Sequence, residues 1–132
     1  MNSLTVNKED IMKIEFYEAK NAEGTVMYIS SKKEELSNSK DVAQETIKKH
    51  EVIFRKPNFK DNTNILSKAI KVESGNIVVD PVMLKYVRFV TLLKDWDLID
   101  DDGMPMSPNS TSVDKLDSDV ANLIMDQLEK II

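Results

Sequence analysis

The sequence has no cysteine, only three glycines and a single histidine in 132 residues. Without cysteine the chain can form neither disulfides nor thiolate–zinc sites, and it has no cysteine nucleophile, which fits a reducing compartment. Three isolated glycines cannot make a glycine-rich phosphate loop, and one histidine cannot make a multi-histidine metal site. No serine stands in a nucleophile-elbow motif. We therefore expect a protein that is not an enzyme and that holds no cofactor and no metal.

Long apolar runs are also missing. Residues 1–16 contain none, so we expect neither a signal peptide nor a membrane span, and we predict a cytoplasmic protein that does not act on membranes. An apolar content of 41% over 132 residues can supply one modest hydrophobic core. The length therefore predicts a single domain over residues 1–132.

Charge of either sign is plentiful but unevenly distributed. Residues 95–132 carry ten acidic side chains against two lysines, a balance of -8, whereas the first 94 residues sum to +3, within a total of -5. Such asymmetry can orient a partner or favour head-to-tail contacts between copies, although a solvated acidic end is the simpler explanation. Basic side chains between Lys48 and Lys60 could touch phosphates, but a nucleic-acid-binding domain normally has a positive total, so we expect no nucleic-acid partner.

The first third of the chain has the alternation that is typical of strands. Residues 12–20 and 25–30 alternate on either side of a loop that contains Gly24, which predicts a β-hairpin. The segment EVIFRK at 51–56 alternates in the same way and ends at Pro57, so it is a candidate third strand.

Helical spacing predominates elsewhere. Asp80 as cap and Pro81 at the first position make the helix that they open the clearest of these predictions. The segments with helical spacing or composition are 32–36, 41–50, 65–70, 81–93 and 118–131. Between the third and the fourth, Ser74-Gly75-Asn76 is a turn signal, and residues 77–79 follow as a very short extended piece. We therefore predict an α+β fold, a mostly helical domain with a small antiparallel β element. Its hairpin and first helices would occupy residues 1–50 and its helical part residues 51–132.

The helix predicted at 81–93 is apolar around most of its surface. Val82, Met83, Tyr86, Val87, Val90 and Leu93 form one stripe, and Leu84, Phe89 and Leu92 lie outside it. Only Lys85, Arg88 and Thr91 interrupt the apolar surface. Such a helix either sits at the centre of the core or keeps one face for a partner.

Five aspartates crowd the segment LLKDWDLIDDDGMP at 92–105. With Gly103 at the sixth position of a calcium loop, Leu98 would be the first ligand and Asn109 the twelfth, so the opening and closing carboxylates are both missing. An acid–base site needs carboxylates held in a cleft with separated pKa values. Asp102-Gly103 is instead a strong turn dipeptide, and we expect an exposed turn here.

Three motifs follow one another over residues 51–132. A strand with the FRKP motif leads into a helix, an LLKDW-L segment ends the next helix, and a D-DG-P turn introduces the last ones. This order resembles small phage proteins of the tail-assembly chaperone type. The first fifty residues have no counterpart in that pattern. The stretch MSPNSTSVDKL also departs from it, because an acidic helix cap is expected after the proline.

The resemblance implies a non-enzymatic protein of the host bacterial cytoplasm that takes part in virion morphogenesis. Its partner would be a hydrophobic phage tail protein, the tape measure or the tube subunit, which it holds until the tail assembles. Two helices could form a groove for a partner helix. The residues that we expect to bind the partner are Phe89, Leu92, Leu93 and Trp96 on the first surface and Leu123, Ile124 and Leu128 on the second. Core packing is the alternative role for each of them.

Two other functions remain open. One is a structural component of the virion, a tail or connector protein whose self-association forms rings. Rings held by opposite charges would weaken in salt, whereas a chaperone would stay small until its client is present. The other is a host-directed binding protein that inhibits a bacterial enzyme through a single tight complex.

Overall fold

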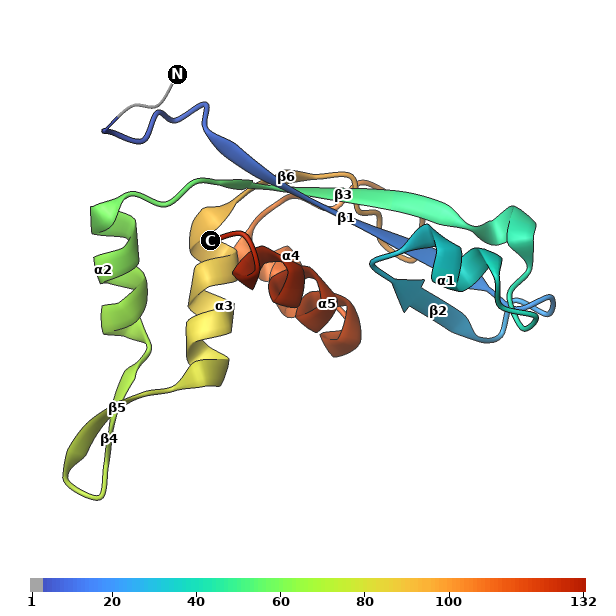
Figure 1. The fold of residues 1–132 in the computed structure, drawn as a ribbon. Coiled ribbons are helices and arrows are strands. Elements are labelled where there is room, and N and C mark those ends of the chain that lie inside the picture. The colour runs from blue at the N-terminus through green and yellow to red at the C-terminus, as the bar shows by residue number, and fades with distance from the viewer. Residues whose placement is uncertain (1–3) are drawn as a thin grey trace.

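The computed structural model describes residues 4–132, which form an α+β fold (Figure 1). Helices make up 36% and strands 28%, so the predicted class is confirmed, but the domain is not mostly helical. The elements are β1 (Ile11–Lys20), β2 (Met27–Ser30), α1 (Lys33–Ser37), the 3-10 helix η1 (Gln44–Thr46), β3 (Lys48–Arg55), α2 (Phe59–Lys68), β4 (Ile70–Glu73), β5 (Asn76–Val79), α3 (Pro81–Leu92), β6 (Leu93–Trp96), α4 (Ser110–Asp114) and α5 (Ser118–Glu129). Among residues 4–132, no helix combines the length and the apolar character that a membrane span requires.

The main sheet has the strand order β2-β1-β3-β6, and each neighbouring pair is antiparallel. The predicted hairpin (β1–β2) and the candidate third strand (β3) are thus confirmed. The register places Phe16 opposite His50 and Ile14 opposite Val52. Because residues opposite one another in a pair point to the same face, these side chains form one continuous and mostly apolar surface. Helices α3 and α5 lie against it (Figure 1).

The opposite face of β1 and β3 is charged. Glu15 and Glu51 lie directly opposite each other, which alone would be unfavourable. Lys13 lies 3.2 Å from Glu51, and Lys49 lies 3.2 Å from Glu15 and 3.3 Å from Glu51, so two lysines offset the repulsion. The alternation that predicted the strands therefore separates a helix-covered face from a solvated one.

The helix predicted over residues 41–50 is wrong. Only η1 is helical there, and β3 already begins at Lys48. Ala43 donates its backbone N–H to Lys20 O at 2.8 Å, and Lys20 donates its own to Thr46 Oγ1, also at 2.8 Å. Val42 packs with Ala19 and with Leu36 of α1. These long-range contacts with the end of β1 hold the segment extended against its helical pattern.

A four-residue strand, β6, follows α3 directly and was not predicted. The helix ends because Leu93 adopts an extended backbone, with φ -60° and ψ 125°. Trp96 then pairs with Val52 of β3, is 8% exposed, and donates its indole N–H to Met106 O at 2.7 Å. Four residues are too few to show an alternation, so only the sheet edge that they join reveals them as a strand.

Helix α2 starts with a reciprocal cap. Asp61 donates its backbone N–H to Asn58 Oδ1 at 2.8 Å, and Asn58 donates its own to Asp61 Oδ2 at 3.0 Å. Arg55, at the end of β3, donates two hydrogen bonds to the Asp61 carboxylate and one to Thr91 O of α3. The Arg55 hydrogen bond lowers the pKa of Asp61. This junction joins β3, α2 and α3.

We expect Asn58→Ala to destabilise the fold by about 1 kcal/mol, because it removes the acceptor of one orphan helix N–H. The control is Asn62→Ala, at an exposed position of the same helix. Alanine is the better helix former there, so Asn62→Ala should leave stability unchanged or slightly raise it. Urea denaturation followed by circular dichroism compares the two variants. Equal losses would show that the cap contributes nothing.

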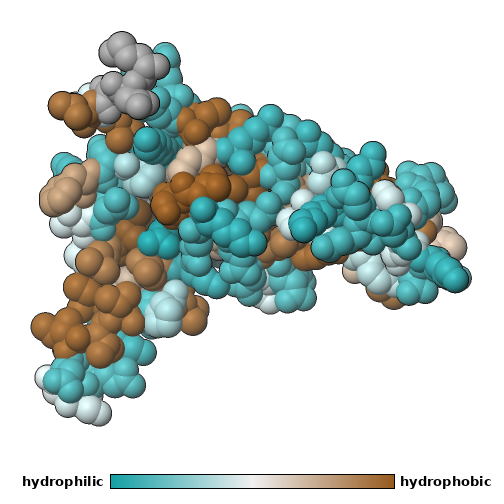
Figure 2. All heavy atoms as spheres, in the orientation of Figure 1, coloured by the Kyte–Doolittle hydropathy of each residue, from teal (hydrophilic) through white to brown (hydrophobic). Residues whose placement is uncertain are grey.

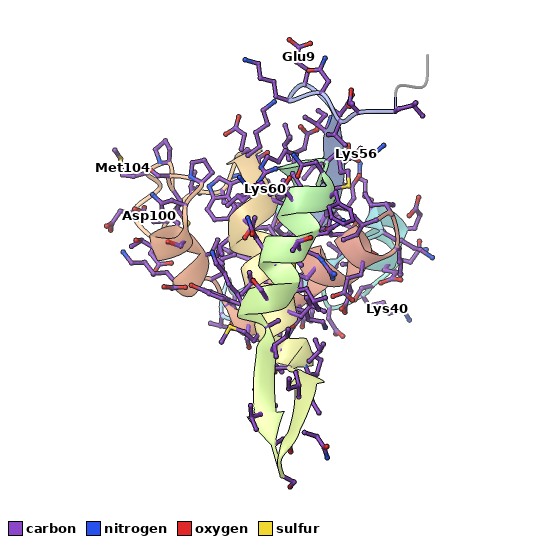
Figure 3. All side chains as sticks on the ribbon, turned by 90° about the vertical axis from the view of Figure 1, so that its left-hand side faces the viewer. Glu9, Lys40, Lys56, Lys60, Asp100 and Met104 are labelled. Atoms are coloured by element: carbon purple, nitrogen blue, oxygen red, sulfur yellow. The ribbon has the colours of Figure 1, made fainter. Side chains whose placement is uncertain are left out.

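Strands β4 and β5 form a separate hairpin that extends beyond the helices (Figures 1 and 3). We call it the arm. Its turn at Ser74-Gly75-Asn76 was predicted, and both Ser74 (φ 52°) and Gly75 (φ 80°) adopt the left-handed backbone of a tight turn. The preceding helix ends at Lys68, so Ile70, which was predicted to be helical, belongs to a strand.

Candidate functional site

An open groove runs between α3 on one side and α4–α5 on the other. Its volume is about 690 Å³. Helix α3 contributes Pro81, Val82, Lys85, Tyr86 and Phe89, and the opposite wall consists of Val113, Asp114, Leu116, Ser118, Ala121, Asn122 and Met125. This is the pair of helices for which the sequence predicted a groove.

The floor and rim of the groove follow from the helical repeat. Val82, Tyr86 and Phe89 are spaced four and three residues apart, so they lie on one side of α3. Phe89 is 2% exposed and forms part of the floor, whereas Tyr86 is 40% and Val82 is 77% exposed. Across the groove Met125 is buried. The apolar surface thus runs from the core to the solvent along one groove.

Polar contacts join the helices at the rim. Tyr86 donates its hydroxyl to Asp114 Oδ1 of α4 at 2.6 Å, and this hydrogen bond raises the pKa of Tyr86. Lys85 Nζ lies 3.2 Å from Asp126 Oδ1 of α5. Further along the same helices, Arg88 lies 3.8 Å from Glu129. The two cations of α3 therefore pair with carboxylates of α5, and part of the acidic charge of residues 95–132 is used inside the chain.

The structure places most of the predicted partner-binding residues in the core. Phe89, Leu92, Trp96, Ile124 and Leu128 are all at most 8% exposed, and Leu93 and Leu123 are half-buried against the same core. Of the seven, only Phe89 lines the groove, as part of its floor. The other four buried residues offer a partner no surface in this conformation, because the sheet and the neighbouring helices already cover them.

Sequence reasoning missed Val82, Tyr86 and Ala121, which form the accessible part of the groove. The signal for the first two was present in the apolar stripe of residues 81–93. The chain enters β6 directly after α3, so the sheet covers the C-terminal half of the helix and leaves its N-terminal half open. That difference depends on β6, which the sequence did not reveal.

Comparison with known proteins finds no relative of this chain. No family model, curated protein or solved structure matches the chain. The functional argument therefore rests on the surfaces of the molecule itself.

A second hollow, of about 320 Å³, lies where β1, β3 and the segment after β6 meet. His50 is 4% exposed there, stacks on Phe16 with ring centroids 5.1 Å apart, and donates its Nε2–H to Glu18 Oε1 at 2.6 Å. This hydrogen bond is the main cause that lowers the pKa of Glu18. Within residues 4–132, His50 Nδ1 has no hydrogen-bond partner, although Asp97 Oδ1 lies 3.4 Å away. The cluster thus joins β1 and β3 to the segment that follows β6.

The aspartate-rich segment forms the exposed turn that was predicted. Asp100 Oδ1 accepts hydrogen bonds from the backbone N–H groups of Asp102 and Met104, both at 2.9 Å. Gly103 has φ +78°, which suits glycine, and Ile99 bridges to Pro105 to close the loop. Figure 3 shows Asp100 and Met104 at the side of the molecule, away from the arm. Among residues 4–132, no group of three or more histidine, aspartate or glutamate side chains is arranged to hold a metal ion.

Proposed function

We propose that this protein is a phage tail-assembly chaperone whose α3–α5 groove holds an amphipathic helix of the tape-measure or tail-tube protein. The observation that carries the proposal is the groove itself. It has an apolar floor, solvent-exposed apolar side chains along α3 and a polar rim. The resemblance to tail-assembly chaperones covers residues 51–132, which include every element that lines the groove. The host cytoplasm would be its site of action.

The groove has the chemistry that an amphipathic helix requires. A helix docks through apolar side chains at positions i, i+3 or i+4 and i+7, which enter a groove while the polar side stays in water. Val82, Ala121 and Met125 would contact the apolar side of the client. Asp114 and Asn122 at the rim would contact its polar side. A client with exposed apolar helices aggregates when it is alone, so covering one such helix before assembly keeps it soluble.

We expect Val82→Asp to reduce recovery of the client at least tenfold when the protein is co-expressed with a tape-measure or tail-tube protein. The new carboxylate would be buried without a partner in the complex, which is costly. Val82 is 77% exposed in the free protein, so the fold should be unaffected. Affinity purification followed by size-exclusion chromatography with light scattering measures the complex.

The matched control is Val26→Asp. Val26 is 45% exposed in the loop between β1 and β2, outside the groove, and the substitution changes the net charge equally. This variant should recover as much client as the wild type. Equal recovery with both variants would remove the groove from client binding. Large particles formed by the chain alone and dissolved by salt would instead favour the structural virion component.

A further inference from the structure

The arm presents one wholly apolar face. In its register Ile70 lies opposite Val79 and Val72 opposite Ile77. Opposite residues of an antiparallel pair share a face, so all four side chains point the same way. Val72 is 72% and Ile77 is 75% exposed, and Ile70 and Val79 are each 44% exposed. Figure 2 shows the hydrophobic atoms gathered over the arm, with hydrophilic atoms at its tip.

The charges of the arm lie on its other face and already have partners. Lys71 lies 3.9 Å from Glu73 and 3.8 Å from Asp80, the cap of α3. The residue opposite Lys71 is Val78. No charged side chain therefore interrupts the apolar face, and the arm does not select a partner of opposite charge.

An arm of this kind needs a covering layer from outside its own chain. A lone two-stranded hairpin is marginally stable in water, and it becomes stable with more strands or with packing on an apolar face. Within residues 4–132, none of the four apolar side chains belongs to either core cluster, and none lines a hollow of the molecule.

We propose that the arm is a dimerisation element and that its apolar face is covered by the arm of a second copy of this chain. A two-fold interface brings the same patch of both subunits together, so the patch must be complementary to itself. An apolar face without charges meets this condition because no like charges face each other. Two stacked ribbons would lie about 10 Å apart, which is the spacing at which side chains of facing sheets interdigitate.

The small size of the arm predicts a weak contact. Each strand has four residues, about 14 Å at the usual rise per residue. When two arms lie antiparallel, each covers the apolar face of the other. One such face is well below the ~800 Å² per partner of a standard interface, so we expect a reversible dimer.

The dimer is separate from the proposed function, because the four arm residues do not line the groove. It also differs from a charge-driven ring in its response to salt. Salts such as sulfate strengthen apolar burial, whereas screening weakens contacts between opposite charges. The arm dimer should therefore persist or tighten in sulfate.

The test is analytical ultracentrifugation of the full chain over a range of micromolar concentrations. Wild-type protein should show a monomer–dimer equilibrium, and Val72→Glu should weaken dimerisation at least tenfold. The matched control is Val78→Glu, the same change on the other face of the arm, where the new carboxylate lies opposite Lys71. It should change dimerisation by no more than about twofold, because the apolar face is left intact.

A second variant removes the arm. Asp80 donates its backbone N–H to Ala69 O at 2.7 Å, so the two ends of the arm are neighbours and a two-glycine turn can replace residues 70–79. The shortened chain should remain folded, monomeric and able to bind the client. A wild-type chain that is monomeric at every concentration, equal dimerisation of the two glutamate variants, or a dimer that survives removal of the arm would each overturn the proposal. A wild-type chain that dimerises as expected but binds no client would instead count against the proposed function alone.

Discussion

Replacing Phe89 with alanine is expected to lower the free energy of unfolding by about 3–5 kcal/mol. Phe89 is 2% exposed and meets two aromatic rings edge to face, Phe54 at 5.3 Å and Trp96 at 6.4 Å between centroids. The substitution would leave a cavity where α3 meets the sheet. Because small domains have a total stability of about 5–15 kcal/mol, the variant should be partly unfolded near physiological temperature. Urea denaturation followed by far-UV circular dichroism measures the loss.

The matched control is Phe59→Ala on α2. Phe59 is 89% exposed, so its removal should change stability by no more than about 0.5 kcal/mol. The pair also separates two roles for Phe89. A stable Phe89→Ala variant that fails only to bind the client would make Phe89 a binding residue, as the sequence suggested. Loss of stability together with loss of binding would assign it to the core and to the floor of the groove.

The periodic patterns predicted the elements whose faces differ strongly. β1, β2 and β3 alternate because one side meets the helices and the other meets water or ions. Helices α3 and α5 carry clear caps, with Asp80 accepting from two backbone N–H groups and Asp117 from two. In such elements the local preference and the tertiary environment agree, so the sequence alone is sufficient to predict the element.

The arm shows why β4 was missed although its signal was present, whereas residues 77–79 of β5 were predicted to be extended. Ile70 and Val72 alternate before the turn at Ser74-Gly75, and Ile77 and Val79 alternate after it. The first pair also continues the helical spacing of α2, and four-residue strands cannot decide between the two periods. Only the pairing of β4 with β5 settles which pattern applies.

The sequence did not show which of the apolar residues of α3 are buried, for a different reason. An apolar stripe indicates that a side of a helix avoids water, but it does not show which part another element covers. Phe89 and Val82 both fit a binding residue by type. The sheet buries the first and leaves the second exposed, and this depends on strand pairs that are distant in sequence. Which of two apolar residues on one helix is buried is therefore decided by the assembled fold.

Replacing Glu18 with glutamine is expected to cost about 1 kcal/mol of stability at neutral pH, because it removes the charge from a hydrogen bond made by a buried histidine. His50 is 4% exposed, and its ring stacks on Phe16, so it has little freedom to find another partner. The amide oxygen of glutamine can still accept from Nε2–H, but more weakly than a carboxylate. The isosteric change leaves the packing around His50 intact.

The pH dependence of this loss follows from the direction of the pKa shift. The hydrogen bond from His50 lowers the pKa of Glu18 below its ordinary value of 4.5, although burial opposes the change. A carboxylate whose pKa is lower in the folded state adds stability above the unfolded value, and this stability is lost as the pH falls through the folded value. The difference between wild type and Glu18→Gln should therefore be largest at neutral pH and shrink below about pH 4.5.

Urea denaturation of both proteins from neutral to acidic pH tests this expectation, with Glu23→Gln in the exposed β1–β2 loop as the matched control. The control should follow the wild type at every pH. If Glu18→Gln kept its full deficit in acid, the loss would come from packing and not from the charge. If it showed no deficit at neutral pH, the contact between Glu18 and His50 would not stabilise the junction of β1 and β3. A deficit that fades only in acid would show that the ionised Glu18 supports the buried histidine and, through it, the sheet on which α3 and the groove depend.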